Sequence, residues 1–367
     1  MEMKTKIIKV DMNNLAASLQ EAAFALRQGK ILAFPTETVY GLGAAWDDEE
    51  AINKIFKTKG RPQDNPLIIH VSSVDEMRKY FAFWDKLADV LTSNFCPGPF
   101  TLIMPKSTMV TGPVTAGLST VGVRIPANPI ARKLIELLGN GIAAPSANIS
   151  GRPSPTNAND CYEDLNGLVE YIIDGGDALV GLESTIVAWD GSDLKLLRPG
   201  GISVEEINSC LADNNLDITL QDKTALTLAG NEAPLAPGMK YRHYAPKAKV
   251  EIISGDSIDD KLNTILDFLS EINTSNINFS DNSSGKIALY VSKELHQLLR
   301  PTGIFNTLDL SIIEFLNNDF AVSAAHGLFS AFREFDRQAV DYILVEALEE
   351  DNLAKAYMNR LRKAANN

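Results

Sequence analysis

The sequence predicts two α/β domains: an N-terminal domain built on a large, twisted, mixed β-sheet, and a smaller C-terminal domain with three α/β layers. The length of 367 residues is enough for two domains at about 150 residues per domain. In the N-terminal part, many short apolar runs are separated by Gly- and Pro-rich turns with few helical segments between them, which favours a mixed sheet. In the C-terminal part, strand-like and helical segments alternate, which favours a parallel sheet covered by helices.

The expected N-terminal elements follow from the spacing of apolar residues. Residues 14–28 repeat apolar side chains at helical spacing and are followed by Gly29, a residue type that commonly ends helices. Asp47 and Asp48 can cap a second helix, whose apolar face begins at Ile52. Short apolar runs bounded by turn residues predict strands at 31–34, 67–71, 100–105, 121–125, 170–174 and 184–189.

The C-terminal part begins after residues 211–236, which lack sustained periodicity and are interpreted as a connector. Strands are expected at 249–254, 286–291 and 341–346, alternating with helices at 258–271, 320–337 and 351–364. This rhythm is typical of a Rossmann-like unit with a parallel sheet. The Asn/Ser-rich stretch 272–286 is expected to form a surface loop. The predicted boundaries are 1–210 for the N-terminal domain, 211–247 for the linker and 248–367 for the C-terminal domain.

Composition and charge exclude several classes of protein. The 34 basic and 47 acidic side chains give a net charge of −13, which disfavours a general nucleic-acid coat protein. Hydrophobic residues make up 45%, and no apolar window reaches the ~18 residues of a transmembrane helix. The N-terminus carries an acid and several lysines where a signal peptide needs an apolar core, so a cytoplasmic protein is expected. Cys96, Cys161 and Cys210 form no C-x-x-C pair, which argues for a reducing compartment and against structural zinc.

Two acid-poor stretches stand out in this acidic chain. Between Val90 and Asn159, Glu136 is the only acid, and five bases give the stretch a net charge of +4. A second stretch, Pro237–Lys247, has three bases and no acid. Such stretches suit a site for an anion such as a nucleotide triphosphate or a carboxylate. Chance combined with burial, which removes charges of both signs, is the alternative.

Four ordered motifs in the N-terminal part and one in the linker carry a more specific signal. They are Pro35–Gly43, Lys59–Pro62 together with Asn65–Leu67, Ala144–Gly151, Glu183–Ile186 together with Arg198–Gly200, and Pro237–Pro246. Together they resemble the YrdC-like fold of threonylcarbamoyl-AMP synthases. The linker and the expected last helix, at Met358–Ala365, resemble the long, two-domain form of that family. The resemblance spans essentially the whole chain. The sequence has no G-x-G-x-x-G and no G-x-x-x-x-G-K-[ST] motif, so dehydrogenase and P-loop interpretations gain no support.

The resemblance implies an L-threonylcarbamoyladenylate synthase, a nucleotidyltransferase that joins L-threonine, bicarbonate and ATP with Mg²⁺ and releases pyrophosphate. Its product would pass to a threonylcarbamoyl transferase that modifies tRNA to threonylcarbamoyladenosine. Positioning and charge stabilisation carry most of the catalysis in such a phosphoryl transfer. The sequence leaves direct tRNA binding, the oligomeric state and the role of the C-terminal domain open.

The candidate phosphate-binding residues are basic or lie in a turn. Lys59 and Arg61, two residues apart on a loop or short strand, can point the same way toward phosphate oxygens, although a bare K-x-R is also common as a solvated surface pair. Ser146 and Asn148 follow a proline in a turn, where hydroxyl, amide and backbone N–H groups can meet an anion. By resemblance these four are catalytic. By resemblance the ATP-binding residues are Arg61, Asn65, Thr120, Ser146, Ser154, Arg198 and Tyr241.

L-Threonine requires a partner for its carboxylate and contacts for its hydroxyl. Arg124 is the natural carboxylate clamp, although an arginine on an alternating strand is otherwise simply its exposed side. His70 ends an apolar strand and could contact threonine or the carbamate; a structural role for this histidine is nearly as good an interpretation. By resemblance the threonine-binding residues are Thr38, His70, Arg124, Ala144 and Ser184. No carboxylate cluster marks a protein-built magnesium site; Glu37 and Glu183 could hold the ion through water.

The basic, aromatic linker Pro237–Pro246 suggests a lid over a polyanion, with Tyr241 and Arg242 as its contacts, or else a simple strap between domains.

Two other functions remain as alternatives. Carbamoyltransferases of hydrogenase maturation share the YrdC-like domain, but they add zinc-binding Cys pairs and an acylphosphatase-like module. A non-enzymatic RNA-binding module would use the basic stretches as its footprint, against the overall acidity of the chain.

Overall fold

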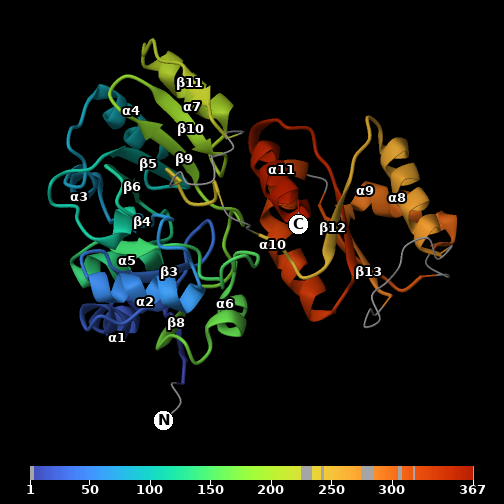
Figure 1. Cartoon of the computed structure of the whole chain (residues 1–367), viewed down its shortest axis with the longest axis horizontal. Coiled ribbons are helices and arrows are strands. Elements are labelled where there is room, and N and C mark those ends of the chain that lie inside the picture. The colour runs from blue at the N-terminus through green and yellow to red at the C-terminus, as the bar shows by residue number, and fades with distance from the viewer. Residues whose placement is uncertain are drawn as a thin grey trace. The chain divides into compact units, whose positions relative to one another are not determined.

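The computed structural model describes residues 4–224, 234–240, 244–273, 285–304, 308–316 and 319–366. The chain divides into two compact units, Met1–Tyr241 and Arg242–Asn367, each with its own sheet (Figure 1). Within the described ranges, no helix combines the length and the apolar character needed to cross a membrane.

The N-terminal unit is built on an 11-stranded mixed sheet, as the sequence predicts. Five neighbouring strand pairs run parallel and five antiparallel. In order across the sheet the strands are β1 (Lys6–Lys9), β8 (Tyr171–Asp174), β2 (Leu32–Phe34), β3 (Gly41–Ala45), β7 (Ile142–Ala144), β4 (Ile68–His70), β6 (Thr120–Arg124), β5 (Phe100–Pro105), β9 (Thr185–Trp189), β10 (Leu194–Arg198) and β11 (Leu220–Asp222).

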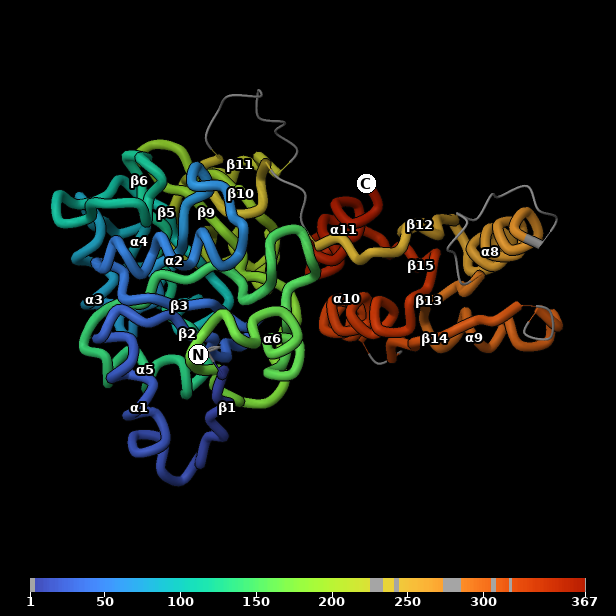
Figure 2. Tube along the Cα trace, turned by 60° about the horizontal axis from the view of Figure 1, so that its bottom comes forward, coloured from blue at the N-terminus to red at the C-terminus, as the bar shows by residue number. Residues whose placement is uncertain are grey.

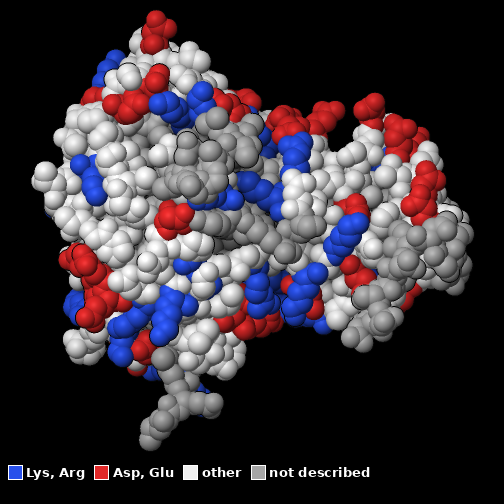
Figure 3. Space-filling model, viewed as in Figure 1, with Lys and Arg blue, Asp and Glu red and all other residues white. Residues whose placement is uncertain are grey.

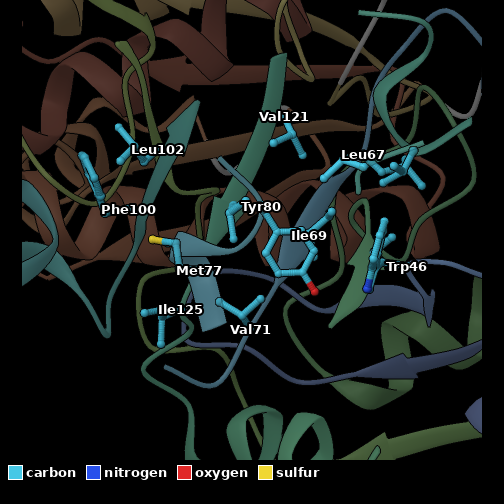
Figure 4. Close-up of a cluster of buried hydrophobic side chains, with 14 of the residues drawn as sticks. Trp46, Leu67, Ile69, Val71, Met77, Tyr80, Phe100, Leu102, Val121 and Ile125 are labelled. Carbon is cyan, nitrogen blue, oxygen red and sulfur yellow. The ribbon is translucent and has the colours of Figure 1, made fainter. Parts of the chain in front are cut away.

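One face of this sheet carries the main hydrophobic core. Alternate side chains of the central strands, such as Ile69, Leu102 and Val121, point into this core and meet Met77 and Tyr80 (Figure 4). Each fully buried side chain of this size contributes about 1.5–3 kcal/mol to folding. The helices that cover this face are α2 (Glu49–Lys59), α3 (Val74–Arg78), α4 (Lys86–Phe95), α6 (Ala158–Leu165) and α7 (Val204–Asp213).

The opposite face of the sheet is covered at its two ends by different segments. At the β1 end, α1 (Leu15–Arg27) and α5 (Pro129–Leu138) pack together over a second apolar cluster. Strand β1 and α1 lie side by side (Figure 2) and are joined by an ion pair between Lys6 and Glu21. Farther along the sheet, Ala236 and Met239 of the linker cover a third cluster, made by Ile68, Ile103, Ile186 and Leu197.

Helix ends follow local chemistry that can be seen in the sequence. Asp48 caps α2 by accepting a hydrogen bond from the N–H of Ala51, and Gly60 ends that helix in the left-handed conformation. Ser203 and Glu206 form a complete capping box at the start of α7. The cap and the terminal glycine explain why the helix predicted near 47–56 is confirmed as α2. The helix predicted at 14–28 is confirmed as α1, and Gly29 follows it with a φ of 68°.

The C-terminal unit has a four-stranded, fully parallel sheet, which confirms the predicted three-layer architecture. Helices α8 (Ile258–Asn273) and α9 (Lys293–Leu299) lie on one face, and α10 (Phe320–Arg337) and α11 (Asn352–Ala365) on the other (Figure 1). In order across the sheet the strands are β12 (Lys249–Ile253), β15 (Tyr342–Glu346), β13 (Ile287–Ser292) and β14 (Leu310–Phe315).

Several expectations about elements were wrong or incomplete. The connector expected at 211–236 contains the end of α7 and also β11, which pairs in parallel with β10. The expectation of few helices among the N-terminal strands was wrong, since α3–α7 were missed there together with β1, β3, β7 and β10. In the C-terminal unit the sequence pattern missed β14, a half-buried edge strand, and α9, which has only seven residues. Most of the loop expected at 272–286 lies outside the described residues, and α8 extends into its first two positions.

Candidate active site

The predicted site residues on the sheet share the face opposite the main core. Side chains alternate between faces along a strand, so Ile69 and Val123 point into the main core while His70 and Arg124 point the other way. Strand pairing then aligns His70 with Arg124, and Arg124 with Thr101 of β5. The result is a row of polar side chains on a sheet face whose neighbouring regions are apolar.

Arg124 is buried at the centre of this row, with 4% of the residue exposed. The alternative that it is simply the exposed side of a strand is therefore wrong. Its Nε donates to the carbonyl oxygen of Gly98 at 3.2 Å, Nη1 donates to Oγ1 of Thr38 at 2.7 Å, and Nη2 donates to Oε1 of Glu37 at 2.6 Å. These contacts use three of its five N–H groups and leave one hydrogen on each terminal nitrogen without a partner in the described part of the chain. Two such N–H groups match the two oxygens of a carboxylate.

Glu37 is the buried anion that balances Arg124. Burial by itself raises the pKa of Glu37, but the Arg124 charge and hydrogen bonds from backbone N–H groups outweigh it, so the pKa lies below its ordinary value. The Glu37 carboxylate therefore stays ionised at neutral pH. Glu37 also fixes the surrounding backbone, because its carbonyl oxygen accepts a hydrogen bond from the N–H of Val180 at 2.7 Å.

His70 ends β4 beside Arg124 and is buried. Its ring meets Phe34 edge-on with ring centroids 5.8 Å apart, and its Nδ1 lies 3.2 Å from the carbonyl oxygen of Ile68. Burial and the nearby Arg124 charge lower the pKa of His70 to about 3. The ring is therefore neutral at physiological pH and can act there as a hydrogen-bonding or packing group, not as a cation.

The pH dependence of stability should reveal this lowered pKa. Between about pH 3 and the ordinary pKa of 6.5, the unfolded chain binds the His70 proton more readily than the native chain. Stability contributed by the neutral ring is thus present above pH 6.5 and is lost as the pH falls. We expect His70→Gln to flatten the decrease in unfolding free energy between pH 6.5 and 4.5, as measured by urea denaturation. An unchanged slope would show that the ring already titrates normally in the native protein.

Ser184, a predicted threonine-binding residue, is hydrogen-bonded to Arg198, a predicted ATP-binding residue. Its Oγ lies 2.8 Å from Oγ1 of Thr101 and accepts a hydrogen bond from Nη2 of Arg198 at 3.1 Å. Arg198 also donates to the carbonyl oxygens of Ser184 and of Pro237 in the linker, at 3.1 and 3.3 Å. Thr101 is a site neighbour that the sequence missed; the only available signal was its position at the polar side of an alternating strand.

Lys59 and the turn Ser146–Arg152 form the second group of candidates. Lys59 is the last residue of α2, not part of a loop or strand as expected, and only 2% of it is exposed. Its Nζ donates to the carbonyl oxygens of Ser146 and Asn148. Within the turn, Oγ of Ser146 donates to Oδ1 of Asn148 at 2.5 Å, and Nδ2 of Asn148 donates to the carbonyl oxygen of Arg152 at 2.9 Å. The turn is thus shaped by its own polar side chains around a lysine.

Arg61 and Asn65 lie in the loop that leads from α2 to β4. Arg61 is 8% exposed and donates from Nε and Nη2 to the carbonyl oxygens of Asn65 and Pro66, at 3.1 and 2.9 Å. Burial of Lys59 and Arg61 contradicts the interpretation as a solvated surface pair. The side-chain amide of Asn65 is fully buried, and neither its nitrogen nor its oxygen has a hydrogen-bond partner among the described residues. Such orphaned polar atoms are uncommon in native structures, where a water molecule, an ion or a ligand satisfies them.

The remaining candidates lie at the margins of these two groups. Ala144 ends β7 and pairs with Ile68, and Ser154 donates from Oγ to Oε1 of Glu183 at 2.6 Å. A Cβ on Gly200 would lie 2.2–2.4 Å from backbone atoms of residues 183–185, so only glycine lets this motif pack beneath Ser184.

The linker lies against Thr120, at the start of β6. Leu235 and Pro237 line a cavity of about 10 Å³ together with Thr120 and Pro66, which leaves room for one water molecule at most. Lys240 forms an ion pair with Asp64 at 3.3 Å. Thr120 itself is half-buried, so part of its surface remains exposed beside the linker. Tyr241 and Arg242, on which the predicted lid depends, lie outside the described residues.

Comparison with known proteins identifies the family. A family model described as "Telomere recombination" (Sua5–YciO–YrdC) matches residues 24–200, and one described as "Threonylcarbamoyl-AMP synthase, C-terminal domain" matches residues 202–366. The threonylcarbamoyl-AMP synthase of Pyrococcus abyssi is 42% identical, with 94% of this chain and 93% of the relative covered. The Bacillus subtilis protein of the same name is 37% identical, with 99% and 98% covered.

A solved structure agrees with these sequence matches. The crystal structure of P. abyssi Sua5 complexed with L-threonine matches this chain with a TM-score of 0.86 at 40% identity, covering 98% of each chain. The matches include both units, so the resemblance seen in the sequence motifs is confirmed. The chain belongs to the threonylcarbamoyl-AMP synthase family, in its long form of a YrdC-like part followed by a second α/β domain.

Proposed function

We propose that this chain is an L-threonylcarbamoyladenylate synthase, which converts L-threonine, bicarbonate and ATP into threonylcarbamoyl-AMP and pyrophosphate. The family and the names of its near full-length relatives support this activity. The observation that carries the proposal is the polar row on one sheet face. In this row the Arg124 guanidinium donates to the Thr38 hydroxyl, and Thr101, which pairs with Arg124 across the strands, lies 2.8 Å from the Ser184 hydroxyl. A carboxylate clamp beside hydroxyl groups is the chemistry that an amino acid with a hydroxyl side chain requires.

Threonine would bind with its carboxylate on the two remaining N–H groups of Arg124 and its hydroxyl near Thr38 or Ser184. The free amine reacts with bicarbonate to give a carbamate and water. A carbamate oxygen then attacks the α-phosphorus of ATP, and the bond to the β-phosphate oxygen breaks as pyrophosphate leaves. Lys59 and Arg61 supply positive charge for the phosphate oxygens, and Ser146 and Asn148 supply hydrogen-bonding groups.

The orphaned amide of Asn65 supports the nucleotide part of this proposal. An amide offers a donor and an acceptor side by side, and both are without a partner among the described residues. The adenine base presents a matching acceptor and donor on one edge. We assign Asn65 to ATP on this complementarity and on the family resemblance.

The part of the chain that the structure describes holds no cluster that would bind Mg²⁺ without the phosphates of ATP. Among the described residues, no group of three or more His, Cys, Asp or Glu side chains could hold a metal ion. Glu37 is paired with Arg124, and Glu183 accepts a hydrogen bond from Ser154. We propose that Mg²⁺ enters with the phosphates of ATP, since this ion is commonly held by substrate phosphates, water and one or two carboxylates.

The chemistry of the product indicates which enzyme must act next. Threonylcarbamoyl-AMP is a mixed anhydride of a carbamate and a phosphate, so it requires a transferase that moves the threonylcarbamoyl group to tRNA before water hydrolyses it. We propose that this occurs in the cytoplasm, where ATP and tRNA are available. All three cysteines are free thiols, which agrees with a reducing compartment.

Pyrophosphate release tests the proposal directly. Purified protein with ATP, Mg²⁺, L-threonine and bicarbonate should release pyrophosphate, and omission of threonine or of bicarbonate should abolish the release. Release without threonine would instead favour the carbamoyltransferase alternative.

Absence of release, with RNA binding that weakens steeply as salt rises, would favour the binding-module alternative. On the face shown in Figure 3, Lys and Arg side chains are intermixed with Asp and Glu side chains. The net charge of −13 argues against that outcome.

A further inference from the structure

Asp164 is a buried carboxylate outside every motif that the sequence singled out. It lies on α6, and its side chain has no exposed surface. Its Oδ2 accepts a hydrogen bond from the backbone N–H of Ile149 at 3.1 Å, and its Oδ1 lies 2.5 Å from Nη1 of Arg152. Both partners belong to the turn Ser146–Arg152, so one carboxylate fixes two points of that turn.

The Asp164 carboxylate is negative and contacts the turn that is proposed to meet the ATP triphosphate. A negative charge close to a triphosphate site repels the ligand, and a buried carboxylate is costly unless it is paired and hydrogen-bonded. Here both oxygens are engaged by the turn, and the Arg152 guanidinium balances the charge. The arrangement suits a residue that fixes the shape of the turn without itself meeting the nucleotide.

The shape of the turn determines the orientation of the Asn148 amide and, through it, of the Ser146 hydroxyl. Ile149 directly follows Asn148, whose Nδ2 donates to the carbonyl oxygens of Ile149 and Arg152 at 2.8 and 2.9 Å. Loss of the Asp164 contacts removes one anchor from each of the two residues to which this amide is bonded, and leaves the turn with its internal bond from the N–H of Arg152 to the carbonyl oxygen of Ile149. The orientation of Asn148 is then less firmly fixed, and with it that of the Ser146 hydroxyl, which donates to Oδ1 of Asn148.

We propose that Asp164 is a positioning residue for ATP, which fixes the turn Ser146–Arg152 so that Ser146 and Asn148 meet the triphosphate. The inference rests on the proposed function. The inference predicts different effects on the two substrates. The proposed threonine-binding side chain, Arg124, donates its hydrogen bonds to Glu37, Thr38 and Gly98, none of which belongs to this turn. Asp164 therefore affects the kinetics of ATP and not those of L-threonine.

The test compares Asp164→Ala and Asp164→Asn in the full-length chain with Glu163→Gln, an exposed neighbour on the same helix. For Asp164→Ala, kcat/KM for ATP should fall by about 10- to 100-fold, because small misplacements of binding groups have effects of this size. The KM for L-threonine should stay within about two-fold of wild type. Asp164→Asn should give an intermediate loss, since its amide oxygen still accepts from Ile149 but no longer balances Arg152.

Three results would overturn the inference. They are an unchanged kcat/KM for ATP in folded Asp164 variants, equal rises in KM for ATP and for L-threonine in these variants, and a similar fall of kcat/KM for ATP in Glu163→Gln. Thermal unfolding monitors folding, and Asp164→Asn keeps the test valid if the alanine variant does not fold. Calorimetric binding of ATP to wild type and variants separates this inference from the proposed function. Wild-type protein that binds ATP but releases no pyrophosphate contradicts the function, whereas equal ATP binding by wild type and Asp164→Ala contradicts the role of Asp164.

Discussion

Arg124→Lys should raise the KM for L-threonine by about 100-fold and leave the KM for ATP within about two-fold. Lysine keeps a positive charge beside Glu37 but replaces a rigid fork of N–H groups by a single ammonium, which cannot bind Gly98, Thr38, Glu37 and a substrate carboxylate together. Loss of a charged bidentate contact costs about 3 kcal/mol, which corresponds to that factor. Steady-state pyrophosphate release at varied threonine measures the effect.

Glu37→Gln is the matched control for this prediction. It breaks the same ion pair but leaves the guanidinium fork in place, and glutamine can still accept a hydrogen bond from Nη2 of Arg124. Both variants should lose stability, because each disturbs a buried pair. Only the lysine variant should lose most of its affinity for threonine. Equal rises in KM for the two variants would show that the ion pair, and not the fork, determines threonine binding.

Much of the architecture could be predicted because its signals are local. Apolar alternation, caps and turn glycines are read within a few residues, which is why the mixed sheet and the parallel C-terminal unit are confirmed. The same alternation places His70 and Arg124 on one face once their strands are assigned. Strand β14 could not be found this way, because an edge strand with one half-buried face has a weak pattern.

The candidate site was less predictable because its contacts join distant parts of the chain. Thr101 meets Ser184 across 83 positions, and Glu37 meets Arg124 across 87. Neither contact leaves a local trace in composition or spacing. The position of Lys59 at a helix end was missed for a different reason. The expectation of a loop or short strand at Lys59 and Arg61 overlooked that Gly60 between them ends α2 in the left-handed conformation.

Lys59→Met should lower kcat by about 100- to 1,000-fold with a smaller effect on the KM for either substrate. Stabilisation of charge that develops on transferring phosphate oxygens is worth this much when one preorganised group is removed. The buried ammonium lies against the carbonyl oxygens of Ser146 and Asn148, so its charge is fixed beside the turn before the substrate arrives. Single-turnover pyrophosphate release at saturating substrates measures the chemical step.

Lys54→Met on the same helix provides the control, because Lys54 makes its hydrogen bond at the protein surface, to the carbonyl oxygen of Gly29. This variant should retain wild-type kcat. A large loss of kcat in Lys59→Met alone would support a direct role of the charge in phosphoryl transfer. If Lys59→Met kept the wild-type kcat and only its KM for ATP rose, the ammonium would serve ground-state binding alone, because the loss of a group that acts in the transition state lowers the rate even at saturating substrate.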